Sequence, residues 1–176
     1  MKKTKKKSFV YDNFNTVERV RILENRDLVK GIRLNRNERV EDFSQDLLSK
    51  IFKKVKRYDL GKYPDQSLVY EHLSRYLKIK KENILLSSGI DGSLKSIFEI
   101  FLKPKDKIAY LSPSYAMYIV YSKIFNLNLI SIPYDKNFKL DKAKLIKTIK
   151  SGIKVLFIPN PNQPIEDNLS LKDFKI

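Results

Sequence analysis

The sequence predicts an α/β fold with a mostly parallel sheet whose strands are joined by βαβ crossovers. Short apolar runs rich in Ile, Leu and Val alternate with amphipathic segments of helical period. The two kinds of segment follow one another at spacings that suit right-handed crossover connections. With 176 residues, of which 42% are hydrophobic, the chain is long enough to bury a core of useful size.

The first 30 residues are polar and weakly periodic, and we expect residues 1–30 to form a basic N-terminal extension. Around Val17–Leu23 the pattern predicts a short helix within this extension. A brief extended segment at 31–34 leads into Asn35-Arg36-Asn37-Glu38. From residue 31 onward we expect a single globular unit, because no linker rich in Gly or Ser interrupts the chain.

Two amphipathic helices are expected next. Apolar residues recur at helical spacing over Ser44–Arg57, and Asp42 or Ser44 can cap this first helix. Gly and Pro then punctuate a loop at 59–65. Apolar residues spaced from Leu68 to Leu77 predict the second helix.

The rest of the chain alternates short strands with helices. Apolar runs of strand length predict buried parallel strands, and the segments between them carry apolar residues on one helical face. The expected strands span residues 84–86, 107–111, 129–132 and 154–158. The expected helices span residues 92–102, 115–125 and 141–150, and Asp141 is a good cap for the last of them.

The chain carries a formal net charge of +16, which is typical of proteins that bind nucleic acid. The lysines, however, are spread along the whole chain together with many Ile, Asn, Tyr and Phe, and all these residues have A/T-rich codons. Genome composition is therefore a sufficient cause, and we do not expect nucleic acid to be a partner. A non-catalytic basic module that binds nucleic acid stays as an alternative, and it predicts strongly salt-dependent binding.

Composition excludes several kinds of site. The chain has no cysteine, which excludes disulfides and thiolate metal sites. Its only histidine is His72, so a multi-histidine zinc site is excluded and we expect no metal. No segment approaches the ~20 apolar residues that a bilayer-spanning helix needs, so we expect no membrane contact and a cytoplasmic location.

Three polar segments follow expected strands, at the edge where an open α/β sheet places its ligand site. The first, Ser87-Ser88-Gly89-Ile90-Asp91-Gly92-Ser93, also opens a helix. The first backbone N–H groups of a helix have no partner within it, so this turn suits a phosphate, with help from the serine hydroxyls. Taken alone, such a segment is more often an ordinary strand-to-helix turn with a Ser or Asp cap.

The other two segments bring an aromatic ring and two amides to the same edge. Ser112-Pro113-Ser114-Tyr115 places the Tyr115 ring where it can stack on a flat heteroaromatic ring, although packing at the edge of the core is the commoner role of such a tyrosine. Residues 159–164 contain three prolines, which fix φ and prevent a helix. We expect this rigid loop to aim the amides of Asn162 and Gln163 at a ligand.

Taken in order with Tyr63-Pro64-Asp65, these segments resemble the large domain of class I/II aminotransferases, which are pyridoxal-phosphate enzymes of fold type I. Within that superfamily, the histidinol-phosphate aminotransferase-like branch is the most similar. The resemblance implies pyridoxal 5′-phosphate as cofactor, and an amino donor and a keto acid as small-molecule partners, with histidinol phosphate as a plausible kind of substrate. A decarboxylase that uses the same cofactor is an alternative, since fold resemblance does not fix the reaction.

The resemblance also implies roles for individual residues. Gly89, Ile90 and Asp91 match the cup whose backbone N–H groups bind the cofactor's 5′-phosphate. Tyr115 matches the residue that stacks on the pyridine ring, and Gln163 matches an Asn that hydrogen-bonds the cofactor's 3′-oxygen. In the family, the residue that matches Tyr63 reaches across a dimer to the neighbouring phosphate, so a homodimer is expected. Asn37 and Glu38 match a segment that borders the substrate site.

The sequence departs from the family pattern at several positions, and these differences affect the activity expected of this chain. Ile165-Glu166 replaces the Thr-Gly that follows the last proline, and Gly92 replaces the acidic residue after the cup Asp. The family's cofactor-attaching lysine, its Asp for the pyridinium nitrogen and its carboxylate-binding Arg have no match. We therefore expect residues 31–176 to be part of a large domain, in an N-terminal fragment that has no catalytic residue and is inactive alone. A degenerate product that does not fold stably is a further alternative.

Overall fold

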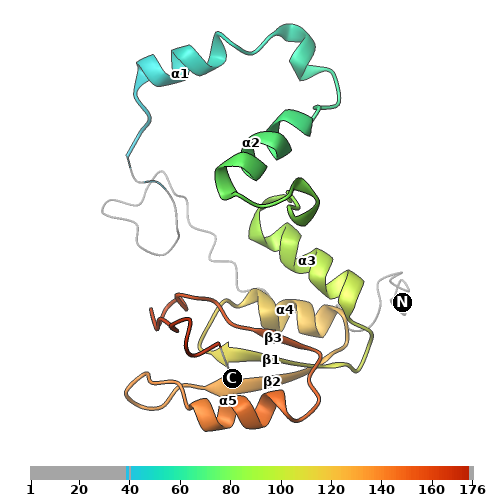
Figure 1. Ribbon diagram of the computed structural model, residues 1–176, viewed down its shortest axis with the longest axis vertical. Helices are drawn as coiled ribbons and strands as arrows, with labels where there is room; N and C mark the ends of the chain where they lie inside the picture. Colours follow the sequence, from blue (N-terminus) through green and yellow to red (C-terminus); the bar gives the residue numbers. More distant parts are fainter. Residues whose placement is uncertain (1–38, 40, 175–176) are drawn as a thin grey trace, which may run out of the picture. The chain divides into compact units, whose positions relative to one another are not determined.

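The computed structural model describes residues 39 and 41–174 (Figure 1). Of these residues, those up to Leu86 form one compact unit and those from Ser87 onward form another. The expectations for residues 1–30 and 31–34 lie outside the described residues. Within the part that is described, no helix combines the length and the apolar character that a bilayer-spanning helix requires.

The unit that ends at Leu86 is helical. Its elements are α1 (Gln45–Phe52), η3 (Arg57–Leu60), α2 (Ser67–Leu77) and η4 (Lys81–Asn83). Ser44 caps α1 as expected, since its hydroxyl accepts a hydrogen bond from the N–H of Leu47 at 3.3 Å. The predicted end of this helix at Arg57 is wrong. After Phe52 the N–H groups of Lys54 and Val55 bond the third residue back, which closes the helix in a tight turn.

The apolar run at 84–86 is not a strand, and this prediction is wrong. The N–H of Leu86 donates to the hydroxyl of Tyr70 at 3.1 Å, a side-chain partner in place of a neighbouring strand. Leu85 is 72% exposed, so the run is not buried either. A short apolar run carries no information about whether a second strand lies beside it.

The unit that begins at Ser87 contains a parallel sheet whose three described strands have the order β2-β1-β3. The strands are β1 (Lys107–Ser112), β2 (Asn128–Pro133) and β3 (Val155–Phe157), and the helices are α3 (Gly89–Phe101), α4 (Met117–Ile124) and α5 (Lys142–Ile149). Ile108 at the centre is in register with Leu129 of β2 and Val155 of β3. The connections through α4 and α5 are βαβ crossovers, so the predicted fold class is confirmed.

The central strand β1 is buried on both faces, which explains its continuous apolar sequence. Successive side chains of a strand point to opposite faces. Ile108 and Tyr110 pack in one cluster with residues of α3 and α4, whereas Ala109 and Leu111 pack in another with Leu145 of α5. Figure 1 accordingly shows α4 and α5 on opposite sides of the sheet.

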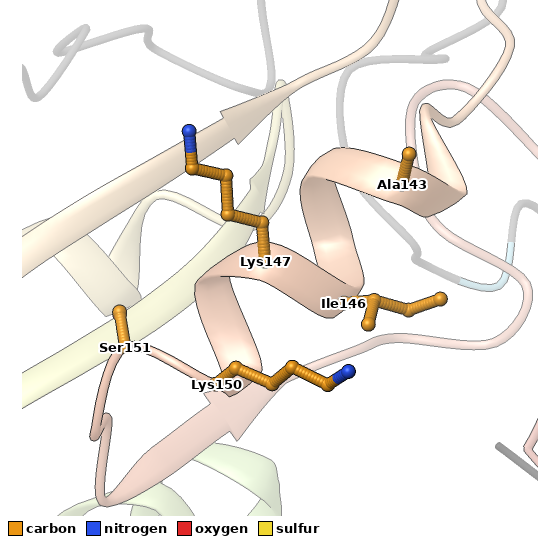
Figure 2. Close-up of a pocket in the computed structure, with 5 residues that line it drawn as sticks. All are labelled: Ala143, Ile146, Lys147, Lys150 and Ser151. Atoms are coloured by element: carbon orange, nitrogen blue, oxygen red, sulfur yellow. The ribbon is translucent and has the colours of Figure 1, made fainter.

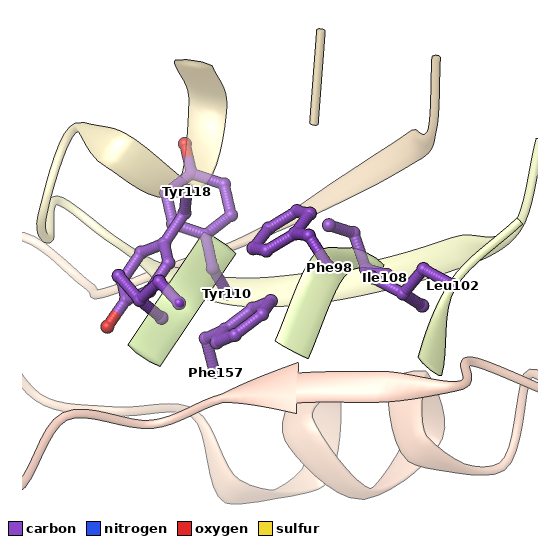
Figure 3. Close-up of a cluster of buried hydrophobic side chains, with 7 residues drawn as sticks. Phe98, Leu102, Ile108, Tyr110, Tyr118 and Phe157 are labelled. Atoms are coloured by element: carbon purple, nitrogen blue, oxygen red, sulfur yellow. The ribbon is translucent and has the colours of Figure 1, made fainter. Parts of the chain in front are cut away.

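Phe98 anchors α3 to the sheet (Figure 3). It is 0% exposed. Its ring lies nearly parallel to that of Phe157 with centroids 5.2 Å apart, and its centroid is 5.3 Å from that of Tyr121. Because β3 and α4 both contact this ring, the position of α3 relative to the sheet is fixed by apolar packing.

The starts of two helices show how local chemistry sets boundaries. α5 begins where expected, because the carboxylate of Asp141 accepts a hydrogen bond from the N–H of Lys144 at 3.0 Å. α3 begins three residues before the predicted start at Gly92, with Gly89 at φ +70° turning the chain into the helix. The segment Gly89-Ile90-Asp91 therefore forms the first turn of α3.

An ion pair ties the beginning of β3 to the turn before β1. Lys154 Nζ lies 2.7 Å from Asp106 Oδ2. Hydrogen bonds from Lys154 and from the N–H of Lys103 hold the pKa of Asp106 below its ordinary value. This contact lies where β1 and β3 start, at the edge of the sheet opposite to their carboxyl ends.

Candidate functional site

Three segments meet at the edge where the parallel strands end. They are the first turn of α3, the β1–α4 loop at 113–116 and the loop at 158–164 after β3. The hydroxyl of Tyr115 donates to Asp91 Oδ1 at 2.7 Å, which joins the second segment to the first. The hydroxyl of Ser114 donates to Asn162 Oδ1 at 2.7 Å, which joins the second to the third. The structure therefore brings together the three segments that the sequence placed at one edge.

The first turn of α3 has a local geometry that suits an anion. Ser87 Oγ donates to the carbonyl of Gly89 at 2.9 Å and lies 2.5 Å from Ser93 Oγ, so two serine hydroxyls bracket the turn. A Cβ added at Gly89 would meet no atom within 4 Å, so the space around this residue is open. The N–H groups at the start of a helix have no partner within it and lie at the positive end of the helix dipole. The turn thus offers N–H donors to an anion in open space.

Asp91 is fixed to the neighbouring segment through both its side chain and its backbone. Its carboxylate accepts the Tyr115 hydroxyl, and its carbonyl oxygen accepts the hydroxyl of Tyr121 at 3.2 Å. The carboxylate is thereby directed at Tyr115. These two bonds hold the first turn of α3 in a set position relative to α4.

The Tyr115 side chain is held by contacts of its hydroxyl and of its ring, and it still faces solvent. Its centroid lies 6.0 Å from that of Tyr118, with the two rings perpendicular. Tyr118 is itself buried, and this burial raises the pKa of its phenol. Tyr115 remains 39% exposed. A flat ligand at this edge can therefore contact a ring whose orientation is fixed by its neighbours.

Asn162 does not serve a ligand, and the expectation that its amide is aimed at one is wrong. The residue is 1% exposed. Its Nδ2 donates to the carbonyl of Pro113 at 3.0 Å and to the hydroxyl of Tyr134 at 3.1 Å. Burial raises the pKa of the Tyr134 phenol, and the bond from Asn162 opposes that effect. Gln163, the next residue, is exposed.

The sequence analysis did not identify Ser114 and Tyr134 as hydrogen-bond partners of Asn162. Ser114 lies within a segment that the sequence marked, but its partner Asn162 is 48 positions away. Tyr134 follows a strand and carries no motif of its own. They are identified through the buried amide of Asn162, because a buried amide needs hydrogen-bond partners and only the folded chain shows which residues supply them.

Three further residues assigned by resemblance are not among the described residues of this unit. Tyr63 belongs to the other unit, in the loop between η3 and α2, and is 98% exposed. Asn37 and Glu38 lie outside the described residues. The candidate site is therefore built from the unit that begins at Ser87.

A separate cavity of about 640 Å³ lies along α5 (Figure 2). It is lined by Ala143, Ile146, Lys147, Lys150 and Ser151. Lys150 and Ser151 precede β3, so this end of the cavity lies at the opposite edge of the sheet from the three segments. Its polar groups are two lysine ammonium groups and one hydroxyl. Among the described residues, no group of three or more His, Asp or Glu is placed to hold a metal ion.

Comparisons with known proteins place the chain in a family. Residues 30–176 match the family described as aminotransferase class I and II. Histidinol-phosphate aminotransferase from Clostridium kluyveri is 32% identical over 136 residues, which cover 76% of this chain and 39% of that protein. The solved histidinol-phosphate aminotransferase from Clostridium acetobutylicum has a TM-score of 0.60 at 26% identity, covering 72% of this chain and 36% of the other. That from Sinorhizobium meliloti, in complex with pyridoxal 5′-phosphate, has a TM-score of 0.60 at 21% identity, covering 69% and 33%.

The chain belongs to the class I and II aminotransferase family, because the family match covers most of its length. The structural likeness shows that its parallel sheet and crossover helices form part of a fold-type I domain, as the sequence predicted. The chain spans about two fifths of the length of the curated relatives it matches.

Proposed function

We propose that this chain forms the part of a pyridoxal-phosphate-dependent aminotransferase that binds the cofactor's phosphate and ring. The observation that carries the proposal is the series of hydrogen bonds that joins the first turn of α3, Tyr115 and the loop of Gln163 at one sheet edge. The Sinorhizobium meliloti relative, whose fold this chain shares in part, is a complex with that cofactor.

The residues at this edge fit the three recognisable parts of the cofactor. The backbone N–H groups of Ile90 and Asp91 would hold the phosphate. The exposed ring of Tyr115 would contact the pyridine ring, and the amide of Gln163 would serve the ring oxygen. When bound, the cofactor supplies an electron sink for amino-group chemistry. The role of this chain would be to bind and orient the cofactor.

Two opposing electrostatic effects act on a phosphate at the first turn of α3. The helix dipole and the N–H groups attract an anion, whereas the carboxylate of Asp91 repels one. The hydrogen bond from Tyr115 directs this carboxylate toward the ring-binding part of the site. Asp91 thus offers its N–H to the phosphate while its side chain serves Tyr115.

For the whole enzyme we propose amino transfer between an amino acid and a keto acid, with a phosphorylated donor similar to histidinol phosphate. The basis is likeness to the curated relatives, which are named histidinol-phosphate aminotransferases. We assign residues 31–176 to part of the large domain and give no residue here a catalytic role. We also propose a homodimer in which the exposed Tyr63 serves the site of a second copy.

Calorimetric titration with pyridoxamine 5′-phosphate tests the proposed function. This form of the cofactor is chosen because its amine, unlike an aldehyde, does not react with the many lysines of the chain. We expect it to bind, and we expect pyridoxamine, which lacks the phosphate, to bind at least about tenfold more weakly, since charge-assisted hydrogen bonds are strong. Equal affinities for the two compounds, or no binding of either, would overturn the proposal.

A further inference from the structure

The side chain of Asn162 links the two loops that present Tyr115 and Gln163. Its Oδ1 accepts the Ser114 hydroxyl at 2.7 Å, and its Nδ2 donates to the carbonyl of Pro113 at 3.0 Å. Ser114 is the residue before Tyr115, and Asn162 is the residue before Gln163. Two hydrogen bonds of one side chain therefore connect the loops that present the two residues we assign to the cofactor ring.

The amide of Asn162 has one orientation that satisfies its partners. It is 1% exposed, and its third contact is the Tyr134 hydroxyl at 3.1 Å. Turning the amide over would place its oxygen against the carbonyl of Pro113, so that two acceptors would face each other with no proton between them. The side chain is therefore a fixed link between the loops.

The backbone of Asn162 carries this fixed position on to Gln163. Its N–H donates to the carbonyl of Asp167 at 3.1 Å, and its carbonyl accepts the N–H of Glu166. These bonds close the turn that contains Gln163. The orientation of Gln163 therefore follows from how Asn162 is seated against the β1–α4 loop.

We propose that Asn162 and Ser114 are positioning residues that set the spacing between the Tyr115 ring and the Gln163 amide. This inference rests on the proposed function, because the spacing matters through the cofactor ring that both residues would contact. The bond between Ser114 and Asn162 is not a contact of the phosphate-binding turn, which is also held by the Ser87 hydroxyl and by the bond from Tyr121 to the carbonyl of Asp91. Loss of the link should therefore weaken recognition of the ring and leave recognition of the phosphate intact.

Ser114→Ala tests this separation. It removes one hydrogen bond, so we expect affinity for pyridoxamine 5′-phosphate to fall about fivefold, while affinity for inorganic phosphate stays unchanged. Ser114→Thr keeps the hydroxyl and should restore the affinity. Tyr134→Phe is the matched control. It removes a different hydrogen bond to the same amide and leaves the bond to Ser114 in place. Its affinity for pyridoxamine 5′-phosphate should stay within about twofold of the native value.

A measurement without any ligand gives a second readout. We expect backbone amide order parameters from ¹⁵N relaxation to fall at both Tyr115 and Gln163 in Ser114→Ala and to stay native in Tyr134→Phe. Two results would overturn the positioning role. One is that the order parameters of Tyr115 and Gln163 stay native in Ser114→Ala. The other is that Ser114→Ala and Tyr134→Phe weaken the binding of pyridoxamine 5′-phosphate and of inorganic phosphate equally. If the native chain binds no pyridoxamine 5′-phosphate, the proposed function fails and the inference falls with it. Native binding that Ser114→Ala leaves intact overturns the inference alone.

Discussion

Replacing Phe98 with Ala is expected to destabilise the unit that begins at Ser87 by about 3–5 kcal/mol. Phe98 is fully buried, and its ring contacts those of Phe157, Tyr121 and Phe125 at centroid distances of 5.2, 5.3 and 5.8 Å. Truncation leaves a cavity between α3 and the sheet that these large rings cannot fill. Domains are stable by only about 5–15 kcal/mol, so this single change removes a large share of the total.

Urea denaturation followed by tyrosine fluorescence measures this loss. Phe101→Ala on the same helix is the matched control, because Phe101 is 64% exposed and its truncation leaves no cavity. We expect the control to change the free energy of unfolding by about 0.5 kcal/mol or less. Similar small losses for both variants would mean that α3 does not pack on the sheet through Phe98.

Gly89→Val is expected to weaken binding of pyridoxamine 5′-phosphate by about 10- to 100-fold. Gly89 has φ +70°, and a β-branched residue is strained there by about 1–3 kcal/mol. The strain is relieved when the first turn of α3 rotates or unwinds. The N–H groups of Ile90 and Asp91 then no longer converge on the phosphate.

Gly152→Val separates this local effect from a general loss of stability. Gly152 has φ +80°, and a Cβ added there also meets no atom within 4 Å. It lies in the turn between α5 and β3, at the opposite edge of the sheet. Calorimetry should show a native affinity in this variant, although its thermal stability falls as in Gly89→Val. Equal losses of affinity in the two variants would place the phosphate elsewhere.

The helices and most strands followed from periodicity because each had a local pattern long enough to read. β1, β2 and β3 were predicted to within one or two residues, since each is an apolar run bounded by polar residues. The run at 84–86 has the same local appearance, yet its backbone bonds a tyrosine side chain rather than a strand. Strand pairing depends on residues that are distant in the sequence. The residues around an apolar run therefore do not determine whether that run pairs with another strand.

The parts of the candidate site whose position follows from the sheet topology were predictable. Parallel strands joined by crossovers end at one edge, so the segments of Tyr115 and Gln163, which follow β1 and β3, had to lie near one another. The segment of Gly89 follows no described strand, and the bond between Tyr115 and Asp91 joins it to this edge. The direction of single side chains was not predictable. Asn162 and Gln163 are adjacent amides in one rigid loop, and only the burial of Asn162 against Ser114 distinguishes the structural amide from the exposed one.

An NMR titration of the ¹⁵N-labelled chain with pyridoxamine 5′-phosphate tests the central claim most directly. We predict that the backbone amides of Ile90 and Asp91 and the side-chain amide of Gln163 shift together along one binding curve. The amides of Ala143 and Ile146, which line the cavity on α5, should stay unchanged and serve as an internal control. Shifts confined to α5, or a curve in which Ile90 and Asp91 do not take part, would contradict the claim that the edge of the sheet holds the cofactor phosphate.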